Sequence, residues 1–358
     1  MPEMLKWIEI DLDAVRHNLA WTLSRLSKGA ALMAVVKADG YGHGAAKVAN
    51  AALEAGAQSL GVLAVEEAEA LRSAGIRGPI HLLAPVLPEQ AAEALALGLI
   101  PTIDTMGQAR AFDAAAGRVK GRKAAFPVHL DLDFGLGRWG LPPRELQGFL
   151  AAFERLKRLT LAGLSAHIDY VAGKNSVEAE EKLRSFGRIA AGLKGRHPHI
   201  VCHAANSSVL MDFPHWQFDM VRAGNLLYGI NPSVWHRARL KCPWRFLARI
   251  MALRRVPKGS SLGYASEYIA PRRMLVATVQ AGYADGLTLE PAERGITLGP
   301  GFQYWGMLRG RKAPFIGRCA ISHTLLDVTG CPGARVGDPV ALPIRRTAAS
   351  HHIARVYV

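Results

Sequence analysis

The segment 35–44, with the sequence VVKADGYGHG, combines a lysine, an acid, a tyrosine and a histidine with three glycines. Lys37 ends the apolar run 31–36, which is typical of a buried strand. An ammonium group at the end of a buried strand is unfavourable unless it is paired, deprotonated or used covalently. The simple alternative is a lysine whose ammonium reaches solvent from a strand end. The glycine-rich turn favours a Schiff-base lysine beside an anion-binding loop.

The elements that would position Lys37 form a regular pattern. Short apolar segments alternate with alanine-rich stretches such as 45–55 and 65–73, which predict helices. The eight predicted strands are 31–37, 59–65, 79–83, 99–103, 127–133, 161–167, 200–207 and 218–224. Eight strands alternating with helices predict an α/β fold, a (β/α)₈ TIM barrel, and the alternative is a doubly wound sheet.

In a TIM barrel the active site lies at the carboxyl ends of the strands. Polar residues end or follow several predicted strands, and we expect most of them to meet at one mouth. They are Lys37, Asp131, Asp133, His167, Asn206, Ser207 and Arg222.

The composition of the chain changes after residue 235, where alanine-rich helical stretches give way to segments rich in Val, Ile, Gly and Pro. Short strand-like runs at 275–280, 313–316, 324–328 and 339–342 are separated by Gly and Pro turns and predict a mostly β domain. The alternating segment 7–12 is predicted to join its sheet. We therefore predict a barrel domain over 10–235 and a C-terminal β domain over 236–358 with residues 1–9.

Composition and charge limit the classes of function that the chain can have. No apolar run is long enough to span a membrane and no signal peptide opens the chain, which predicts a cytoplasmic protein without a membrane partner. The four cysteines form no Cys-x-x-Cys pair, so neither a structural metal nor a disulfide framework is expected. The net charge of +15 and the basic segment 236–245 raise nucleic-acid binding as an alternative. Because no nucleic-acid motif accompanies them, a solvated basic surface is favoured and no nucleic-acid partner is expected.

Six motifs are spread over essentially the whole length of the chain. They are the segment 37–44, Glu9-Ile10-Asp11-Leu12 with His17-Asn18, His203-Ala204-Ala205-Asn206-Ser207, Asp219-Met220-Val221-Arg222-Ala223-Gly224, 256–264, and Gly282-Tyr283-Ala284-Asp285-Gly286. In these motifs and their order the chain resembles the alanine racemase family, which interconverts L- and D-alanine with pyridoxal 5'-phosphate. The resemblance implies a TIM barrel plus a β domain, a homodimer that shares its active site across the interface, and D-alanine supply to the cell wall.

The resemblance also implies roles for individual residues. Lys37 would carry pyridoxal phosphate and act as one base, and Tyr264 would be the opposing base, contributed across a head-to-tail homodimer. Two bases suit racemisation, because a proton leaves one face of the α-carbon and returns to the other. The implied cofactor-binding residues are Lys37, Tyr41, His167, Asn206, Ser207, Arg222 and Gly224. Arg138 and Ile321 would bind the amino-acid substrate.

Within this set the resemblance distinguishes contacts. Tyr41, Ser207 and Gly224 match positions that hold the phosphate. Arg222 matches an arginine at the pyridine nitrogen, and with His167 it matches the network that activates the opposing tyrosine.

Departures from the family gather around the substrate. Asp131 replaces a lysine that many members carbamylate, and it supplies a negative charge directly. Ala320-Ile321-Ser322 replaces a Cys-Met-Asp type of segment that helps to bind the substrate carboxylate. The segment 287–289 lacks the arginine that is usual there. These changes suggest the hypothesis of another substrate, such as serine, lysine or ornithine.

The sequence is also compatible with two other functions. One is a pyridoxal-phosphate lyase or decarboxylase on the same fold, for which Cys319 is the supporting residue. The other is a catalytically impaired pyridoxal-phosphate-binding paralogue, which the altered segment 320–322 supports. The order of Tyr264 and Asp285 and the presence of the β domain favour the racemase.

Overall fold

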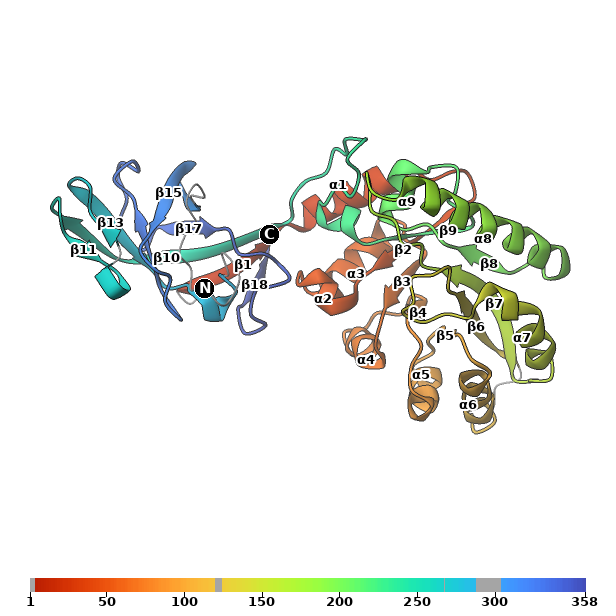
Figure 1. The fold of residues 1–358 in the computed structure, drawn as a ribbon. Coiled ribbons are helices and arrows are strands. Elements are labelled where there is room, and N and C mark those ends of the chain that lie inside the picture. The colour runs from red at the N-terminus through yellow and green to blue at the C-terminus, as the bar shows by residue number, and fades with distance from the viewer. Residues whose placement is uncertain (1–3, 120–123, 267, 288–303) are drawn as a thin grey trace. The chain divides into compact units, whose positions relative to one another are not determined.

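The computed structural model spans residues 1–358 and describes 4–119, 124–266, 268–287 and 304–358. The chain divides into two compact units (Figure 1). One, the barrel unit, is Leu12–Cys242, and the other, the β unit, is Met1–Asp11 together with Pro243–Val358. The first strand of the chain therefore belongs with the C-terminal part of the sequence.

All eight predicted strands form in the barrel unit. They are β2 (Ala31–Val35), β3 (Ser59–Val62), β4 (Ile80–Leu82), β5 (Thr102–Ile103), β6 (Phe126–Leu132), β7 (Leu159–Ala166), β8 (Val201–His203) and β9 (Met220–Ala223). They pair in parallel as two four-stranded sheets, β4-β3-β2-β9 and β5-β6-β7-β8. Parallel bridges between His81 and Ile100 and between Asn206 and Arg222 join the two sheets at both seams. The barrel is thereby closed, and the doubly wound alternative is excluded.

Helices follow the strands around the barrel (Figure 1). They are α1 (Leu12–Leu23), α2 (Lys37–Tyr41), α3 (Ala45–Glu54), α4 (Val65–Ser73), α5 (Ala91–Ala96), α6 (Met106–Ala116), α7 (Leu146–Phe153), α8 (Ser176–Arg196) and α9 (Ser207–Asp212). None of the helices in the described residues is long and apolar enough to cross a membrane.

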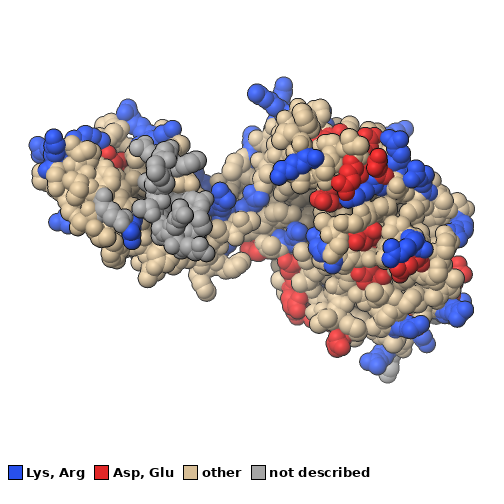
Figure 2. Space-filling model, in the orientation of Figure 1, with Lys and Arg blue, Asp and Glu red and all other residues tan. Residues whose placement is uncertain are grey.

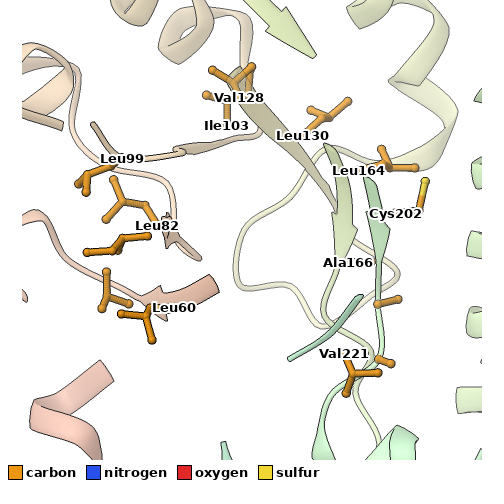
Figure 3. Close-up of a cluster of buried hydrophobic side chains, with 14 of the residues drawn as sticks. Leu60, Leu82, Leu99, Ile103, Val128, Leu130, Leu164, Ala166, Cys202 and Val221 are labelled. Atoms are coloured by element: carbon orange, nitrogen blue, oxygen red, sulfur yellow. The ribbon is translucent and has the colours of Figure 1, made fainter. Parts of the chain in front are cut away.

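Side-chain alternation along the strands separates an apolar layer from a polar one. Leu60, Leu82, Leu130, Leu164 and Val221, drawn in Figure 3, are fully buried and belong to the main hydrophobic cluster. Because successive residues of a strand point to opposite faces, their neighbours in the sequence face the other way. Those neighbours include the buried polar residues Ser59, His81, His129, Asp131, Ser165 and Arg222, and on β8 the buried His203 likewise adjoins the buried Cys202. The interior of the barrel is therefore unusually polar, since TIM-barrel interiors are mostly filled by branched apolar side chains.

The β unit is built around one long strand, β10 (Trp244–Val256), which the sequence patterns did not predict. Its eight-stranded sheet has the order β13-β16-β15-β14-β17-β10-β1-β18, and a further pairing of β13 with β10 closes part of it into a ring. The strands are β1 (Lys6–Ile10), β13 (Met274–Val279), β14 (Trp305–Leu308), β15 (Arg311–Ile316), β16 (Thr324–Asp327), β17 (Pro339–Leu342) and β18 (Arg355–Tyr357). A small hairpin pairs β11 (Ser261–Leu262) with β12 (Tyr268–Ile269). As predicted, β1 joins this sheet, where it lies between β10 and β18.

Basic side chains of the described residues are dispersed over the surface and do not form one patch on the visible face of either unit. Figure 2 shows Lys and Arg scattered over the visible face of each unit, and on the barrel unit they are interspersed with Asp and Glu. A mixed distribution of this kind is typical of a solvated surface.

Candidate active site

A cavity of about 310 Å³ opens among residues at the carboxyl ends of the barrel strands. Its lining includes every residue of the barrel unit that the sequence singled out as cofactor-binding or substrate-binding. These are Lys37, Tyr41, Arg138, His167, Asn206, Ser207, Arg222 and Gly224. Asp131 lines it as well, so strand ends that lie far apart in the sequence meet here.

Lys37 is followed by a left-handed turn. Ala38, Asp39, Gly40 and Tyr41 all have positive φ angles, between 50° and 61°. For residues other than glycine this conformation costs roughly 1–2 kcal/mol each. Side-chain hydrogen bonds hold the turn, because Glu67 Oε1 accepts from Ala38 N at 2.5 Å and Asp39 Oδ1 accepts from the backbone N–H of the first residue of α3 at 2.8 Å. The turn fixes the strand end from which Lys37 enters the cavity.

The amine of Lys37 has a lowered pKa. Partial burial is the main cause, the charge of Arg138 lowers the pKa further, and the carboxylate of Glu67 opposes the shift. A lowered pKa increases the fraction of neutral amine, which is the form that attacks a carbonyl and accepts a proton. The environment of Lys37 therefore suits covalent and acid–base chemistry.

A second corner of the cavity gathers hydrogen-bonding groups around Gly224. Its backbone N–H donates to Ser207 Oγ at 3.1 Å. A Cβ atom built on Gly224 would lie only 2.5 Å from Tyr41 Oη, so this glycine makes room for the phenol. The Tyr41 ring stacks on Tyr228 at a centroid distance of 4.6 Å. Two hydroxyl groups and nearby backbone amides make this corner suitable for a phosphate group.

Asn206 also lies at this corner, but its side chain has a structural task. Its Oδ1 accepts from the backbone N–H groups of Ser208 and Val209, at 2.9 and 3.0 Å, and thereby caps α9. Asparagine is among the preferred residues for this position because it satisfies two otherwise unpaired N–H groups.

Cationic groups form another part of the cavity wall. Arg222 is 7% exposed, and burial lowers its pKa to about 10, so it stays charged at neutral pH. Burial, followed by the charges of Arg222, Arg138 and Lys37, lowers the pKa of His167 to about 3, so His167 is neutral. Arg138 lies over the ring of Trp139 at 3.7 Å. This wall is suited to an anionic substrate.

Asp131 is the buried acid of the cavity. Its Oδ1 accepts from Ser165 Oγ at 2.5 Å. Burial raises its pKa to about 6, although the Ser165 hydrogen bond and the charges of Arg222 and Arg138 act in the opposite direction. At neutral pH Asp131 is largely ionised and partly balances the two arginines.

The remaining predicted site residues, Tyr264 and Ile321, belong to the β unit, whereas the lining of this cavity comes from the barrel unit. Both are well exposed, at 61% and 58%. The segment 320–322 is held by the turn that follows Gly282, where Tyr283 N donates to Ala320 O at 3.1 Å and the next N–H donates to Ile321 O at 3.0 Å. Within the segment 287–289, Thr288 and Leu289 lie outside the described residues.

Several lining residues were not predicted as site residues: Trp139, Ser165, Tyr170 and His203. His203 ends β8 and Ser165 is the last residue but one of β7, so the rule that placed Arg222 at the mouth could have found them. Trp139 and Tyr170 lie in loops after strands, where residue type alone does not distinguish a pocket wall from a surface position.

Comparison with known proteins identifies the class. The N-terminal domain family of alanine racemases matches residues 10–232, and the C-terminal domain family matches residues 244–356. The chain belongs to the alanine racemase family. It is 37% identical over 355 residues to the alanine racemase of Desulfosudis oleivorans, covering 96% of this chain and 88% of that protein. It is 35% identical to that of Halothermothrix orenii, covering 94% of this chain and 86% of that protein.

Solved structures agree with this assignment. The alanine racemase of Streptomyces lavendulae, which produces D-cycloserine, superposes with a TM-score of 0.85 at 28% identity, over 99% of this chain and 97% of that one. The Streptomyces coelicolor alanine racemase gives the same TM-score and identity, over 99% of each chain. The combination of a TIM barrel and a mostly β domain is therefore the fold of this family.

The residues present fit pyridoxal phosphate. Its aldehyde requires a lysine that can be neutral, its phosphate requires clustered hydrogen-bond donors, and its pyridine nitrogen requires a polar partner. Lys37, the corner formed by Tyr41, Ser207 and Gly224, and the wall containing Arg222 offer these groups in one cavity. Among the described residues, no group of three or more His, Cys, Asp or Glu side chains could hold a metal ion.

Proposed function

We propose that this protein is a pyridoxal-phosphate-dependent alanine racemase that interconverts L- and D-alanine. Family membership over both domains supports the reaction, and the meeting of Lys37, Tyr41, Arg138 and Arg222 in one cavity is the observation that carries the site assignment. We further propose a cofactor-binding domain over 10–235, a β domain over the rest of the chain, and a cytoplasmic homodimer that supplies D-alanine for the cell wall.

The residues of the barrel unit divide the work. Pyridoxal phosphate, when bound, accepts the electron pair left on the α-carbon of the substrate. Lys37 Nζ binds the cofactor and takes or returns the α-proton on one face. Tyr41, Ser207 and Gly224 hold the phosphate, and Arg138 orients the substrate carboxylate. Arg222 faces the pyridine nitrogen with a group that does not release its proton, which limits side reactions.

The opposite face of the α-carbon requires a second proton carrier. We assign this role to Tyr264, contributed by the partner subunit of the dimer. The exposed position of Tyr264 in the β unit supports the assignment, because its side chain is available to a second copy of the chain. Ile321, exposed in the same unit, is assigned to the substrate side of that contact.

Hydrogen exchange tests the reaction. The full-length protein with pyridoxal phosphate is incubated in deuterated water with L-alanine and with D-alanine, and α-deuteration and chirality are followed together. We expect exchange with racemisation. Exchange that ends in decarboxylation or cleavage would indicate a pyridoxal-phosphate decarboxylase or lyase. A protein that binds the cofactor but exchanges no amino acid would indicate the catalytically impaired paralogue.

Two variants test the bases. Lys37→Ala should lose both turnover and the visible absorption of the covalently bound cofactor, and covalent cofactor retained in this variant would refute the assignment. Tyr264→Phe should keep the cofactor but slow exchange for one enantiomer more than for the other. Wild-type rates for both enantiomers would show that Tyr264 is not the second base.

A second substrate remains a candidate because of one observation. Ser322 replaces the acid of the family's Cys-Met-Asp type of segment, and the neighbouring apolar side chain of Ile321 is 58% exposed in the segment proposed to face the substrate. Running the same exchange experiment with serine, lysine, arginine and ornithine tests this idea. Rates for alanine that far exceed all of the others would reject altered specificity.

A further inference from the structure

Three imidazole rings occupy the interior of the barrel. His81 on β4, His129 on β6 and His203 on β8 are 5%, 4% and 1% exposed. Burial is the main cause that lowers the pKa of each, and for His81 the value is about 4, so all three rings are neutral at physiological pH. Neutral but polar rings are unfavourable in an interior unless their nitrogen atoms are hydrogen-bonded. The hydrogen-bond partners of these three rings therefore indicate what the rings do in the barrel.

A continuous hydrogen-bonded path leads from the cavity wall to one of these rings. Arg222 Nη1 lies 2.7 Å from His203 Nδ1, and His203 Nε2 lies 2.8 Å from His129 Nδ1. The guanidinium of Arg222 also donates to backbone carbonyls, from Nη1 to His203 O at 2.6 Å and from Nη2 to Ala166 O at 2.7 Å. The acceptors on this path are neutral, and two of them are imidazole nitrogens, whose roles depend on which ring nitrogen carries the proton.

The chemistry of the groups fixes the direction of every hydrogen bond on the path. Arginine has donors only, so His203 Nδ1 must accept and must carry no proton. A neutral imidazole then carries its proton on Nε2, which makes His203 a donor to His129. His129 Nδ1 must therefore accept. A proton on His129 Nδ1 would place two donors against each other and disturb the contact between His203 and Arg222.

The barrel makes room for this ring. His129 pairs in register with Gly163 of β7, and the register of the two strands shifts just before it, between Val128 and His129. A Cβ atom built on Gly163 would lie only 2.3 Å from two atoms of the His129 imidazole. Gly163 has no positive φ angle, so the absence of a side chain there serves space rather than backbone conformation. Any other residue at 163 would displace His129.

We propose that His129 is a positioning residue for Arg222. By accepting from His203 Nε2, His129 holds the His203 ring in the tautomer and orientation in which Nδ1 accepts from Arg222, and the guanidinium is thereby fixed in the cavity wall. The effect on catalysis rests on the proposed function, in which Arg222 faces the pyridine nitrogen. The effect on the His203 tautomer concerns the protein alone.

Nitrogen NMR of the histidine side chains tests the tautomer in the full-length protein, without and with pyridoxal phosphate. In the wild type, His203 should show an unprotonated Nδ1 and a protonated Nε2. His129→Leu removes the acceptor and leaves a buried donor unsatisfied, so the Nδ1 resonance should move toward the protonated or averaged position. His129→Asn should restore the wild-type resonance, because the amide oxygen can take the place of Nδ1.

A second pair of variants keeps the test independent of folding defects. His129→Gln carries the same amide as His129→Asn but places it near the former Nε2 position, so it should behave like His129→Leu. Gly163→Ala displaces the ring without altering any polar group and should also shift the His203 resonance. An unchanged His203 resonance in folded His129→Leu, His129→Gln and Gly163→Ala proteins would overturn the proposal.

Kinetics provide the functional readout. His129→Leu should lower kcat by about tenfold, the effect expected for one buried donor left unsatisfied, and His129→Asn should recover most of the loss. His81→Leu is the matched control, because it makes the same chemical change in a ring that lies outside the hydrogen-bonded path. The centroids of the His81 and His129 rings are 4.9 Å apart in an edge-on arrangement, so both variants alter the packing of the same cluster. Equal losses in His81→Leu and His129→Leu would reduce His129 to a packing residue. If the wild type exchanges no amino acid, the proposed function fails, whereas the NMR result still decides the role of His129.

Discussion

Glu67, in the first turn of α4, accepts a hydrogen bond from the backbone N–H of Ala38, the residue that follows Lys37. Its second oxygen accepts from Leu63 N at 2.8 Å. One carboxylate thus joins the turn after β2 to the loop after β3. It is also the anion that opposes the lowering of the Lys37 pKa. Glu67 therefore links the backbone conformation beside Lys37 with the reactivity of the amine.

Replacing Glu67 by glutamine should lower the pKa of Lys37 further, because the substitution removes the charge that raises it. The measurement is the pH dependence of covalent attachment of pyridoxal phosphate to the cofactor-free protein. We expect the midpoint to move to lower pH. Glu66→Gln, one residue earlier in the same helix turn, is the control and should leave the midpoint in place. A midpoint that stays fixed or rises in Glu67→Gln would contradict this account of the electrostatics.

Ala38→Gly should stabilise the protein by about 0.5–1 kcal/mol. Ala38 is exposed and has a φ angle of 50°, which glycine adopts without the steric conflict of a Cβ atom, and this gain exceeds the greater freedom of glycine in the unfolded chain. Urea unfolding of the full-length protein measures the difference. Ala151→Gly, at an exposed position within α7, should instead destabilise by about 1 kcal/mol. Destabilisation by both substitutions would show that the left-handed turn is not strained.

Gly224→Ala should weaken the binding of pyridoxal phosphate by about tenfold or more. The added methyl group would overlap with Tyr41 Oη, and the stack of Tyr41 on Tyr228 restricts the escape of the ring. The dissociation constant is measured by titrating cofactor-free protein and following the visible absorption. Gly192→Ala, where a Cβ atom meets no other heavy atom within 4 Å, is the control. Unchanged affinity in Gly224→Ala would remove Tyr41 from the proposed phosphate site.

Stability should fall in mild acid because of the buried histidines. Above pH 6.5 the ring of His81 is neutral in the folded and unfolded states alike. Below pH 6.5 His81 becomes protonated in the unfolded chain, whereas in the folded protein it stays neutral down to about pH 4. Protonation of His81 therefore favours unfolding. For His81 alone the loss amounts to about 2 kcal/mol at pH 5 relative to pH 8.

The variant His81→Leu isolates this contribution. Its difference from the wild type at pH 8 measures the altered packing, and the change in that difference between pH 8 and pH 5 measures the titration of His81. Asp131, whose raised pKa acts in the opposite direction, is present in both proteins and therefore cancels. A difference that does not change with pH would show that His81 is not held neutral.

Much of the barrel could be predicted because its signals are local. Apolar runs such as that ending at Lys37 identify the strands, and the rule that active sites lie at the carboxyl ends of strands places Arg222 and Ser207 without knowledge of any contact. The resemblance to a family added roles for these residues. Neither source gives distances, so the cap formed by Asn206 and the close approach of the Tyr41 hydroxyl to Gly224 required the structure.

Other features were inaccessible because they depend on contacts between distant segments. The path from Arg222 to His129 spans β6, β8 and β9, and each histidine taken singly has the pattern of an ordinary buried residue. The long strand β10 was not predicted because its charged residues interrupt the alternation expected of a strand. Its identity as a strand is set by pairing with β1, β13 and β17.

The pairing of β1 with β10 has a consequence for how the chain is made. Ile8 lies opposite Phe246, so the first strand leaves the ribosome long before its partner has been synthesised. Domains generally fold as units during synthesis, N-terminal first. The barrel unit ends at Cys242, so it can fold before β10, the partner of β1, has been synthesised. During that interval an unpaired, partly apolar strand edge is open to the wrong partners. A chain interrupted shortly after the barrel would carry this strand permanently without its native neighbour.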